Sequence, residues 1–212
     1  MSGDFKPSRA SAARLSLYLR CLESWERGGR ETTSSIGLAA ALGIGDAQVR
    51  KDLSLLGGLG RRGVGYRVSN LIQAIRVALG VDRTWSAVLV GAGNLGRALL
   101  RYQGFSERGF RIVGVFDNDP RKIGQRIEDL EVFDFKEFRE RTGELKAELA
   151  IVAVPSEGIE EVAKGLAEAG IRGVLNFAPT LLRLPEGTPI VNVDLTIQLE
   201  QLAFQIRTGS EE

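Results

Sequence analysis

Three glycines and one acid in the middle of this 212-residue chain have the spacing of a dinucleotide-binding site. Residues 91–96 read G-x-G-x-x-G and directly follow the apolar run 86–90. In such a loop the first glycine allows a tight bend, the second lets the backbone approach a pyrophosphate, and the third permits close helix–strand packing. The predicted phosphate-binding residues are Gly91, Ala92, Gly93, Asn94, Leu95 and Gly96.

Asp117 lies 21 residues beyond Gly96, at the end of a second apolar run. A carboxylate in this place accepts hydrogen bonds from an adenosine ribose and repels a 2′-phosphate, which favours NADH/NAD+ over the phosphorylated cofactors. Arg121 and Lys122 are close in the sequence and argue in the opposite direction. Asp119, which precedes a proline, is interpreted as a turn residue.

Strands and helices are expected to alternate after the glycine loop. This order is typical of an α/β fold with a Rossmann-like parallel sheet that is covered on both faces. Such sheets bind ligands beyond the carboxyl ends of their strands. The predicted strands are 87–90, 112–116, 149–154, 174–177 and 190–193, and the predicted helices are 95–103, 136–141 and 157–168.

Two of these predicted strands run into a proline, which stops the strand and frees the loop that follows. We expect both loops to line the nicotinamide side of the cleft, with an aromatic ring and the prolines as an apolar wall. Each loop is equally compatible with a simple strand end. The candidate contacts are Val154, Pro155, Asn176, Phe177 and Ala178.

The first 80 residues predict a separate helical domain. Apolar residues recur at helical spacing over 11–27, and hydroxyl residues at 33–35 can cap a second helix that ends before Gly43. Asp46 can cap a third helix, 47–56, and the two short helices resemble a helix-turn-helix motif, whose second helix enters the DNA major groove. The apolar face of the third helix comprises Val49, Leu53 and Leu56, with Gln48, Lys51, Asp52 and Leu55 opposite.

A glycine-rich segment with an arginine pair, 57–68, follows and predicts a small β-hairpin. Arginines at the tip of such a wing can reach phosphates or a narrow minor groove, and a solvated turn is the alternative. With a helix over 70–79, residues 1–80 are predicted to form a winged helix-turn-helix domain. The predicted contacts to double-stranded operator DNA are Ser34, Ser35, Gln48, Arg50, Lys51, Arg61 and Arg62.

Charge and composition divide the chain in the same way. Residues 1–80 hold 12 Lys/Arg and 6 Asp/Glu, whereas residues 81–212 hold 16 and 21. A basic N-terminal part favours a polyanion partner, although an ordinary basic face gives the same balance. The chain has no histidine, and Cys21 is its single cysteine, so we expect no internal disulfide and no metal. Without a signal segment or a long apolar run, a cytoplasmic protein without membrane contact is expected.

Residues 84–193 contain no recognisable proton relay for hydride chemistry. Histidine is absent, Tyr102 is the only tyrosine after Tyr66, and no lysine follows Tyr102 at the helical Tyr-x-x-x-Lys spacing. We therefore expect a protein that senses NADH/NAD+ without turning it over, not an enzyme. An NAD(H)-dependent oxidoreductase and a CoA-binding module, which uses a similar glycine-rich sheet, remain the alternatives.

Residues 194–212 predict a terminal helix that is apolar on two sides and therefore needs two packing partners. Burial within the same chain is one way to supply them. Asp194 precedes the helix and is a candidate N-cap. One apolar stripe comprises Leu195, Leu199, Leu202 and Ile206, and Ile197 and Phe204 lie almost opposite.

The chain resembles the Rex family of redox-sensing transcriptional repressors over nearly its whole length. The matching segments, in order, are RLSLYLR (14–20), VRKDLS (49–54), GRRGVGY (60–66), GAGNLG (91–96), FDNDP (116–120), NFAP (176–179) and VNVD (191–194). The resemblance implies a homodimer with a winged-helix domain and a Rossmann NAD(H) domain. It also implies binding to a two-fold symmetric operator and release when NADH occupies the sites.

The same resemblance gives the terminal helix and three polar residues a role in allosteric coupling. It implies that the helix inserts between the domains of the other subunit. It further implies that Asp194 communicates with Arg20 and Tyr102. The family often has an aromatic residue where this chain has Leu195, so a ring-stacking role is not expected there.

Overall fold

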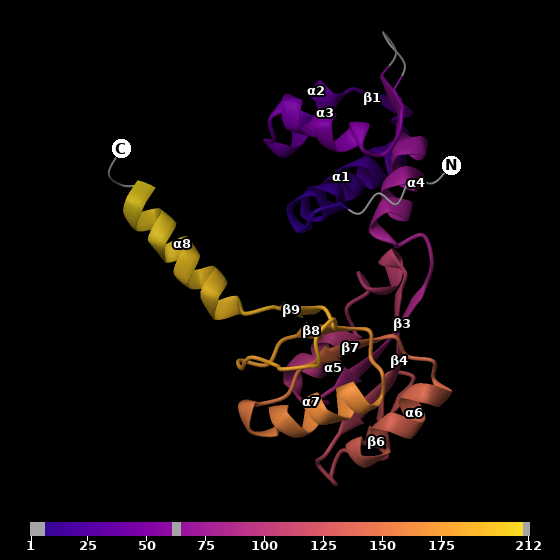
Figure 1. Cartoon of the computed structure of the whole chain (residues 1–212), viewed down its shortest axis with the longest axis vertical. Helices are drawn as coiled ribbons and strands as arrows, with labels where there is room; N and C mark the ends of the chain where they lie inside the picture. Colours follow the sequence, from indigo (N-terminus) through magenta and orange to yellow (C-terminus); the bar gives the residue numbers. More distant parts are fainter. Residues whose placement is uncertain (1–6, 61–64, 210–212) are drawn as a thin grey trace. The chain divides into compact units, whose positions relative to one another are not determined.

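The computed structural model of the protein describes residues 7–60 and 65–209 (Figure 1). The chain divides into two compact units, Met1–Arg83 and Thr84–Glu212. Buried apolar clusters lie within each unit, one in the first and two in the second.

The described part of the N-terminal unit has four helices and a two-stranded sheet. A single apolar core joins α1 and α4, since Leu15, Tyr18 and Leu22 of α1 and Leu71 and Ile75 of α4 are all less than 2% exposed. The elements are α1 Arg9–Arg27, β1 Thr32–Thr33, α2 Ser35–Leu42, α3 Asp46–Ser54, β2 Tyr66–Arg67 and α4 Val68–Leu79.

The turn between α2 and α3 forms as the sequence predicts, with one correction. Ser34 caps α2 by accepting a hydrogen bond from the Gly37 amide at 3.0 Å, and Gly43 ends the helix in the left-handed region at φ 64°. The predicted capping role of Asp46 is wrong, because Gly45 is the N-cap and Asp46 is the first helical residue. An acid in this first turn still favours the helix through the dipole.

The strand predicted near Tyr66 exists, but its partner is not local. β2 pairs antiparallel with β1, which precedes α2, with Thr33 opposite Tyr66. The predicted hairpin within 57–68 includes residues 61–64, which lie outside the described residues, so it stays a prediction. The pairing of β2 with β1 was not predicted, because local turn signals carry no information about a distant strand. Gly65 (φ +87°) sits against the backbone of Thr33, where any Cβ would overlap. Arg61 and Arg62 lie outside the described residues.

The second unit is built on a seven-stranded sheet of described residues, in the order β5-β6-β4-β3-β7-β8-β9. All neighbours pair in parallel except β5 with β6. The five predicted strands are confirmed to within two residues at either end, whereas β5 and β6 were not predicted. The strands are β3 Trp85–Val90, β4 Phe110–Asp117, β5 Arg126–Ile127, β6 Leu130–Asp134, β7 Leu149–Val152, β8 Gly173–Asn176 and β9 Ile190–Asn192.

Helices cover both faces of the sheet, as predicted from the alternation of strands and helices. On one face, Val88 and Val90 of β3 pack in the same cluster as residues of α6 (Phe138–Glu144) and α7 (Ile159–Glu168). On the other face, Leu89 packs with residues of α5 (Asn94–Leu100). Short 3-10 turns, η1 Ser106–Arg108, η2 Phe135–Glu137 and η3 Ser156–Gly158, complete the connections. The terminal helix α8, Leu195–Gly209, has no buried residue. None of the helices in the described ranges has the length and apolar character needed to span a bilayer.

Candidate functional site

A cleft with a volume of about 680 Å³ lies at the carboxyl ends of the central strands. It lies where β3 and β7 are neighbours, and the strand order runs outward in opposite directions from this pair. Ligands of open parallel sheets bind at such a switch point. The predicted site residues that line it are Gly91, Gly93, Asn94, Leu95, Asp117, Val154, Pro155 and Phe177.

The glycine loop is shaped by close backbone contacts. Gly91 has φ +102° and approaches the Ala153 carbonyl so closely that a side chain would overlap it, and Gly96 packs equally closely on the Gly91 carbonyl. A Cβ at Gly93, in contrast, would meet no atom within 4 Å. Gly93 therefore leaves room on the cleft side for a ligand to approach the N-terminus of α5, where phosphate groups bind well.

Asp117 ties the loop to the end of β4. Its side chain is 7% exposed, and its Oδ2 accepts hydrogen bonds from the Ala92 amide at 2.7 Å and from Lys122 Nζ at 2.9 Å. Its Oδ1 accepts the Asp119 amide at 2.9 Å. Burial alone would raise the pKa of Asp117, but these hydrogen bonds and the charge of Lys122 outweigh it and lower the pKa. A carboxylate has about four acceptor positions, so one remains for a ribose hydroxyl.

Both cations that argued for a 2′-phosphate are paired with acids. Lys122 pairs with Asp117, and Arg121 pairs with Asp119 at 3.0 Å while its side chain is 89% exposed. Asp119 is a turn residue, as predicted, because its Oδ1 accepts the Arg121 amide at 3.0 Å. The bonds from Arg121 lower the pKa of Asp119 to about 2. Lys122 is therefore held at Asp117, whereas the exposed pair of Arg121 with Asp119 contributes little energy and leaves Arg121 available for phosphate.

Asn176 and Ala178, predicted to contact the cofactor, are buried and do not line the cleft. The Asn176 amide nitrogen donates to the Thr180 carbonyl at 3.1 Å and to Asn192 Oδ1 at 2.9 Å, and its oxygen accepts the Ala178 amide at 3.0 Å. Asn176 thus fastens the loop after β8, which positions Phe177 in the cleft wall.

Ala92 and Gly96 are also buried, and the cleft contains residues that sequence reasoning missed. Ala92 acts through its backbone amide, and Gly96 through close packing. The missed lining residues come from the turn after β4, which begins within the segment FDNDP (116–120), and from η2, η3 and the start of α7, which no short motif marks. They include Asn118, Lys122, Phe135, Glu157, Glu161 and Val162.

The second helix of the predicted DNA-binding motif exposes two cations. Arg50 is exposed and pairs with Asp46 one turn earlier at 2.6 Å, and Lys51 is also exposed. An exposed pair of this kind contributes little energy, so it leaves Arg50 available for phosphate. Gln48, in the same helix, is half-buried and donates to Asp52 Oδ1 at 3.0 Å.

The structure corrects the predicted position of Asp52 on α3. It was expected opposite the apolar face, but it is 2% exposed and accepts bonds from Arg14, Tyr18 and Gln48. Helical periodicity assigns every acid to the exposed face, so it cannot predict an acid that is buried because other side chains donate hydrogen bonds to it.

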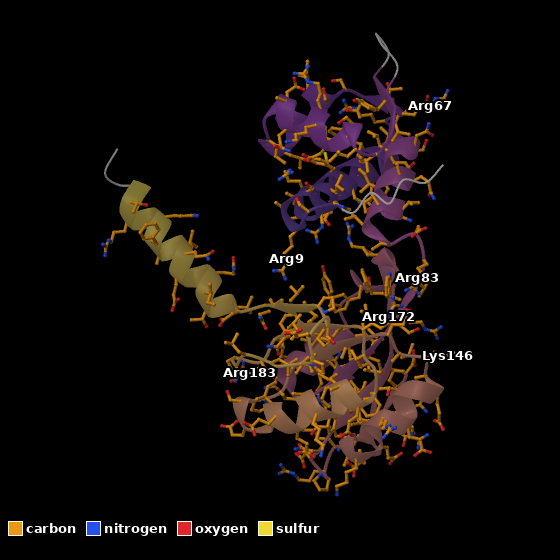
Figure 2. The ribbon with its side chains drawn as sticks, viewed as in Figure 1. Arg9, Arg67, Arg83, Lys146, Arg172 and Arg183 are labelled. Atoms are coloured by element: carbon orange, nitrogen blue, oxygen red, sulfur yellow. The ribbon has the colours of Figure 1, made fainter. Side chains whose placement is uncertain are left out.

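The two serines before α2 have structural roles. Ser34 is the N-cap, and Ser35 is only 8% exposed, so its burial argues against the predicted phosphate contact. Arg67, which the sequence reading passed over, is exposed and points outward from β2 (Figure 2). It adds a cation to the same segment that carries the arginine pair.

Each of the three predicted coupling residues is described within its own unit. Arg20 is exposed on α1. Tyr102 is 53% exposed and makes an edge contact with Phe105 at 5.1 Å between ring centroids. Asp194 caps α8, since its Oδ1 accepts the Thr196 amide at 2.9 Å and the Ile197 amide at 3.3 Å.

The apolar residues of α8 are all exposed, which contradicts the alternative in which they are buried within the same chain. Their exposed fractions lie between 47% and 66%. Six large apolar side chains on one helix in water are costly, at roughly 25 cal/mol for each Å² left exposed. These residues are Leu195, Ile197, Leu199, Leu202, Phe204 and Ile206.

No metal-like cluster of three or more acidic, histidine or cysteine side chains occurs in the part of the chain that the structure describes. Cys21 is half-buried, and burial raises the pKa of its thiol while the charge of Arg30 acts in the opposite direction. A thiol held in its protonated form reacts slowly with oxidants.

The two units define a class of protein in which a winged helix-turn-helix domain is joined to a Rossmann-like nucleotide domain. Family models match both parts: "Putative DNA-binding protein N-terminus" over residues 7–54 and "CoA binding domain" over residues 82–180. A solved structure of RSP in complex with β-NAD+ and operator DNA has a TM-score of 0.91 at 32% identity, covering 98% of this chain and 95% of that chain. RSP in complex with β-NADH gives 0.87 at 31% identity, covering 98% and 97%.

Curated relatives agree over nearly full length. The redox-sensing transcriptional repressor Rex of Carboxydothermus hydrogenoformans is 49% identical, covering 96% of this chain and 98% of the relative. Rex 1 of Thermotoga maritima is 45% identical, covering 91% and 92%. The chain belongs to the Rex family of redox-sensing transcriptional repressors, and its relatives are named as regulators, not as enzymes.

Proposed function

We propose that this protein binds operator DNA as a homodimer and releases it when NADH fills the clefts at β3 and β7. The observation that carries the proposal is the combination, in one chain, of an open glycine-lined cleft with Asp117 at its edge and a helix-turn-helix domain with exposed cations. The RSP structures, named as complexes with NAD+, NADH and operator DNA, support both ligands.

The cofactor fits the residues present. Gly93 leaves space for a pyrophosphate, and Asp117 keeps one acceptor position for a ribose hydroxyl while repelling a 2′-phosphate. Val154, Pro155 and Phe177 form an apolar wall in the same cleft. This wall disfavours the charged ring of NAD+, because a cation is costly to desolvate, and so favours NADH.

The exposed apolar stripes of α8 support the dimer. A second copy of the chain supplies the two packing surfaces that the helix needs, and its insertion there would link the two nucleotide domains. DNA fixes the distance between half-sites, so a modest rotation of one subunit misplaces one recognition helix. A hundredfold loss of operator affinity requires about 2.7 kcal/mol of differential NADH binding between the two arrangements. Arg20, Tyr102 and Asp194 are the proposed coupling residues.

Direct titration of the full-length protein with NADH and NAD+ tests the nucleotide part of the proposal. Tighter binding of NADH is expected, and equal affinities for the two forms would exclude redox sensing. Truncation before α8 is expected to give a monomer in sedimentation velocity, whereas an unchanged dimer would exclude the proposed role of this helix.

A CoA-binding function is the second candidate, because the family model that matches residues 82–180 carries that name. Thermal-shift measurements with NADH, NADPH and CoA separate the two. We expect NADH to raise the melting temperature most. A larger shift with CoA would favour the CoA-binding module, and turnover of NADH with a substrate would favour an oxidoreductase.

A further inference from the structure

Asp52 lies inside the helix-turn-helix domain with all of its acceptor positions occupied. Arg14 Nε and the Tyr18 hydroxyl donate to Oδ2 at 2.6 and 2.8 Å. Arg14 Nη2 and Gln48 Nε2 donate to Oδ1 at 2.8 and 3.0 Å. A carboxylate accepts about four hydrogen bonds, so this buried acid is saturated.

The donors come from two helices. Arg14 and Tyr18 lie one turn apart on α1, so together they hold Asp52, near the end of α3, against α1. Burial would raise the pKa of Asp52, but the bonds from Arg14 and Tyr18 outweigh it and lower the pKa. At neutral pH the group is therefore an acceptor only.

A glutamine amide can turn either its oxygen or its nitrogen toward a neighbour, and a neighbour that only accepts hydrogen bonds selects the nitrogen. Gln48 can face Asp52 only with its nitrogen, which directs its oxygen away from the carboxylate. Among the described residues, the second N–H of the amide has no acceptor and its oxygen accepts no hydrogen bond. An amide N–H beside an amide oxygen is the pair that binds N7 and N6 of adenine in the major groove.

The position of Gln48 agrees with such a contact. It is the third residue of α3, and the first residues of a recognition helix are those that reach base edges. Its side chain is half-exposed, which leaves the amide edge opposite Asp52 accessible.

We propose that Asp52 is a positioning residue that fixes the Gln48 amide to read one adenine in each operator half-site. This inference rests on the proposed DNA-binding function. It assigns the base contact to Gln48 and the choice of amide orientation to Asp52, whereas Arg50 and Lys51 contact phosphates. Loss of the carboxylate would let the amide turn over and would weaken the discrimination without removing the phosphate contacts.

The test uses the full-length protein and a duplex selected by it from a random library. Each adenine of one half-site is replaced in turn by 7-deazaadenine, which lacks the N7 acceptor, and affinities are measured by fluorescence anisotropy. The wild type should lose roughly five- to tenfold at one adenine. Gln48→Ala and Asp52→Asn should bind the parent duplex more weakly and lose that discrimination at the same adenine.

Tyr18→Phe is the matched control, because it removes a bond to Oδ2 and leaves both bonds at Oδ1. It should lower the melting temperature but retain the wild-type discrimination. If Asp52→Asn does not fold, the double variant Arg14→Gln/Asp52→Asn removes both charges together and should give the same loss of discrimination.

Two results would overturn the inference while leaving operator binding intact: an Asp52 variant that retains the full discrimination, or a wild type that is insensitive to 7-deazaadenine at every position. A wild type that selects no duplex at all would instead overturn the proposed function.

Discussion

Two buried aspartates, Asp52 in the DNA-binding unit and Asp117 in the nucleotide unit, hold their surroundings in different ways. Asp52 is bound by three side chains, two of them from another helix. Asp117 is bound by two backbone amides and by Lys122, all from loops at the cleft. The first arrangement fixes helix on helix, as a rigid reading surface requires, whereas the second shapes loops around a space that stays open.

The glycine loop gives the largest expected effect. Gly96→Ala should destabilise the protein by about 3 kcal/mol or more, because the new methyl group overlaps the Gly91 backbone and neither segment can yield. Urea denaturation measures this loss. Gly93→Ala is the control, since its Cβ meets nothing, and it should keep wild-type stability but bind NADH roughly tenfold more weakly or worse. Equal stability of the two variants would contradict the described packing.

Replacing each aspartate by alanine tests the comparison itself. Asp52→Ala should cost about 3 kcal/mol, because it leaves the buried Tyr18 hydroxyl and the Arg14 guanidinium without their acceptor. Asp117→Ala should cost about 1–2 kcal/mol, since Lys122 can reach solvent, and should weaken NADH binding. Denaturant midpoints and NADH titrations measure both. If Asp117→Ala lost more stability than Asp52→Ala, the described difference between a rigid cluster at Asp52 and an open site at Asp117 would be wrong.

The stability of the protein at alkaline pH tests the hydrogen bond between Tyr18 and Asp52. Burial, followed by the hydrogen bond to Asp52, raises the pKa of Tyr18 to about 12. The folded state therefore prefers the protonated phenol, so its contribution is complete below pH 10 and is lost as the pH rises from 10 to 12. Stability should fall by about 2 kcal/mol over this window. Tyr18→Phe should lack this component of the pH dependence, and an identical alkaline profile in that variant would exclude it.

Acid should affect both aspartates in the same direction. Because the pKa of each is lowered in the folded state, their contribution is present at neutral pH and is lost as the pH falls below the ordinary value near 4. This shared behaviour means that alkaline pH, not acid, distinguishes the two clusters.

The smallest expected effect is that of a substitution at Asp194, which distinguishes its role as helix cap from its proposed role in allosteric coupling. Asparagine caps a helix about as well as aspartate, whereas alanine costs about 1 kcal/mol. Asp194→Asn should therefore keep the helicity measured by circular dichroism and alter only the response of operator binding to NADH. An unchanged response would leave Asp194 as a cap alone.

The sequence was most informative where function forces residue types into a short segment. G-x-G-x-x-G and Asp117 both line the cleft, and we propose that they bind the phosphate and the ribose, because each contact needs a fixed chemistry at a fixed spacing. The α2–α3 turn was predictable for the same reason, since Ser34 and Gly43 supply a cap and a left-handed end.

Features that depend on distant partners were not predictable. The burial of Asp52 depends on Arg14 and Tyr18, and the pairing of β2 depends on β1, which lies before two intervening helices. The buried role of Asn176 depends on Thr180 and Asn192. No local pattern contains these partners, so helical periodicity placed Asp52 on the surface, and the strand end before Pro179 placed Asn176 in the cleft.

The most direct measurement is the affinity of the full-length protein for its selected operator duplex at saturating NADH and at saturating NAD+. The account predicts binding about a hundredfold weaker with NADH than with NAD+ or with no nucleotide. Equal operator affinity under all three conditions would contradict it.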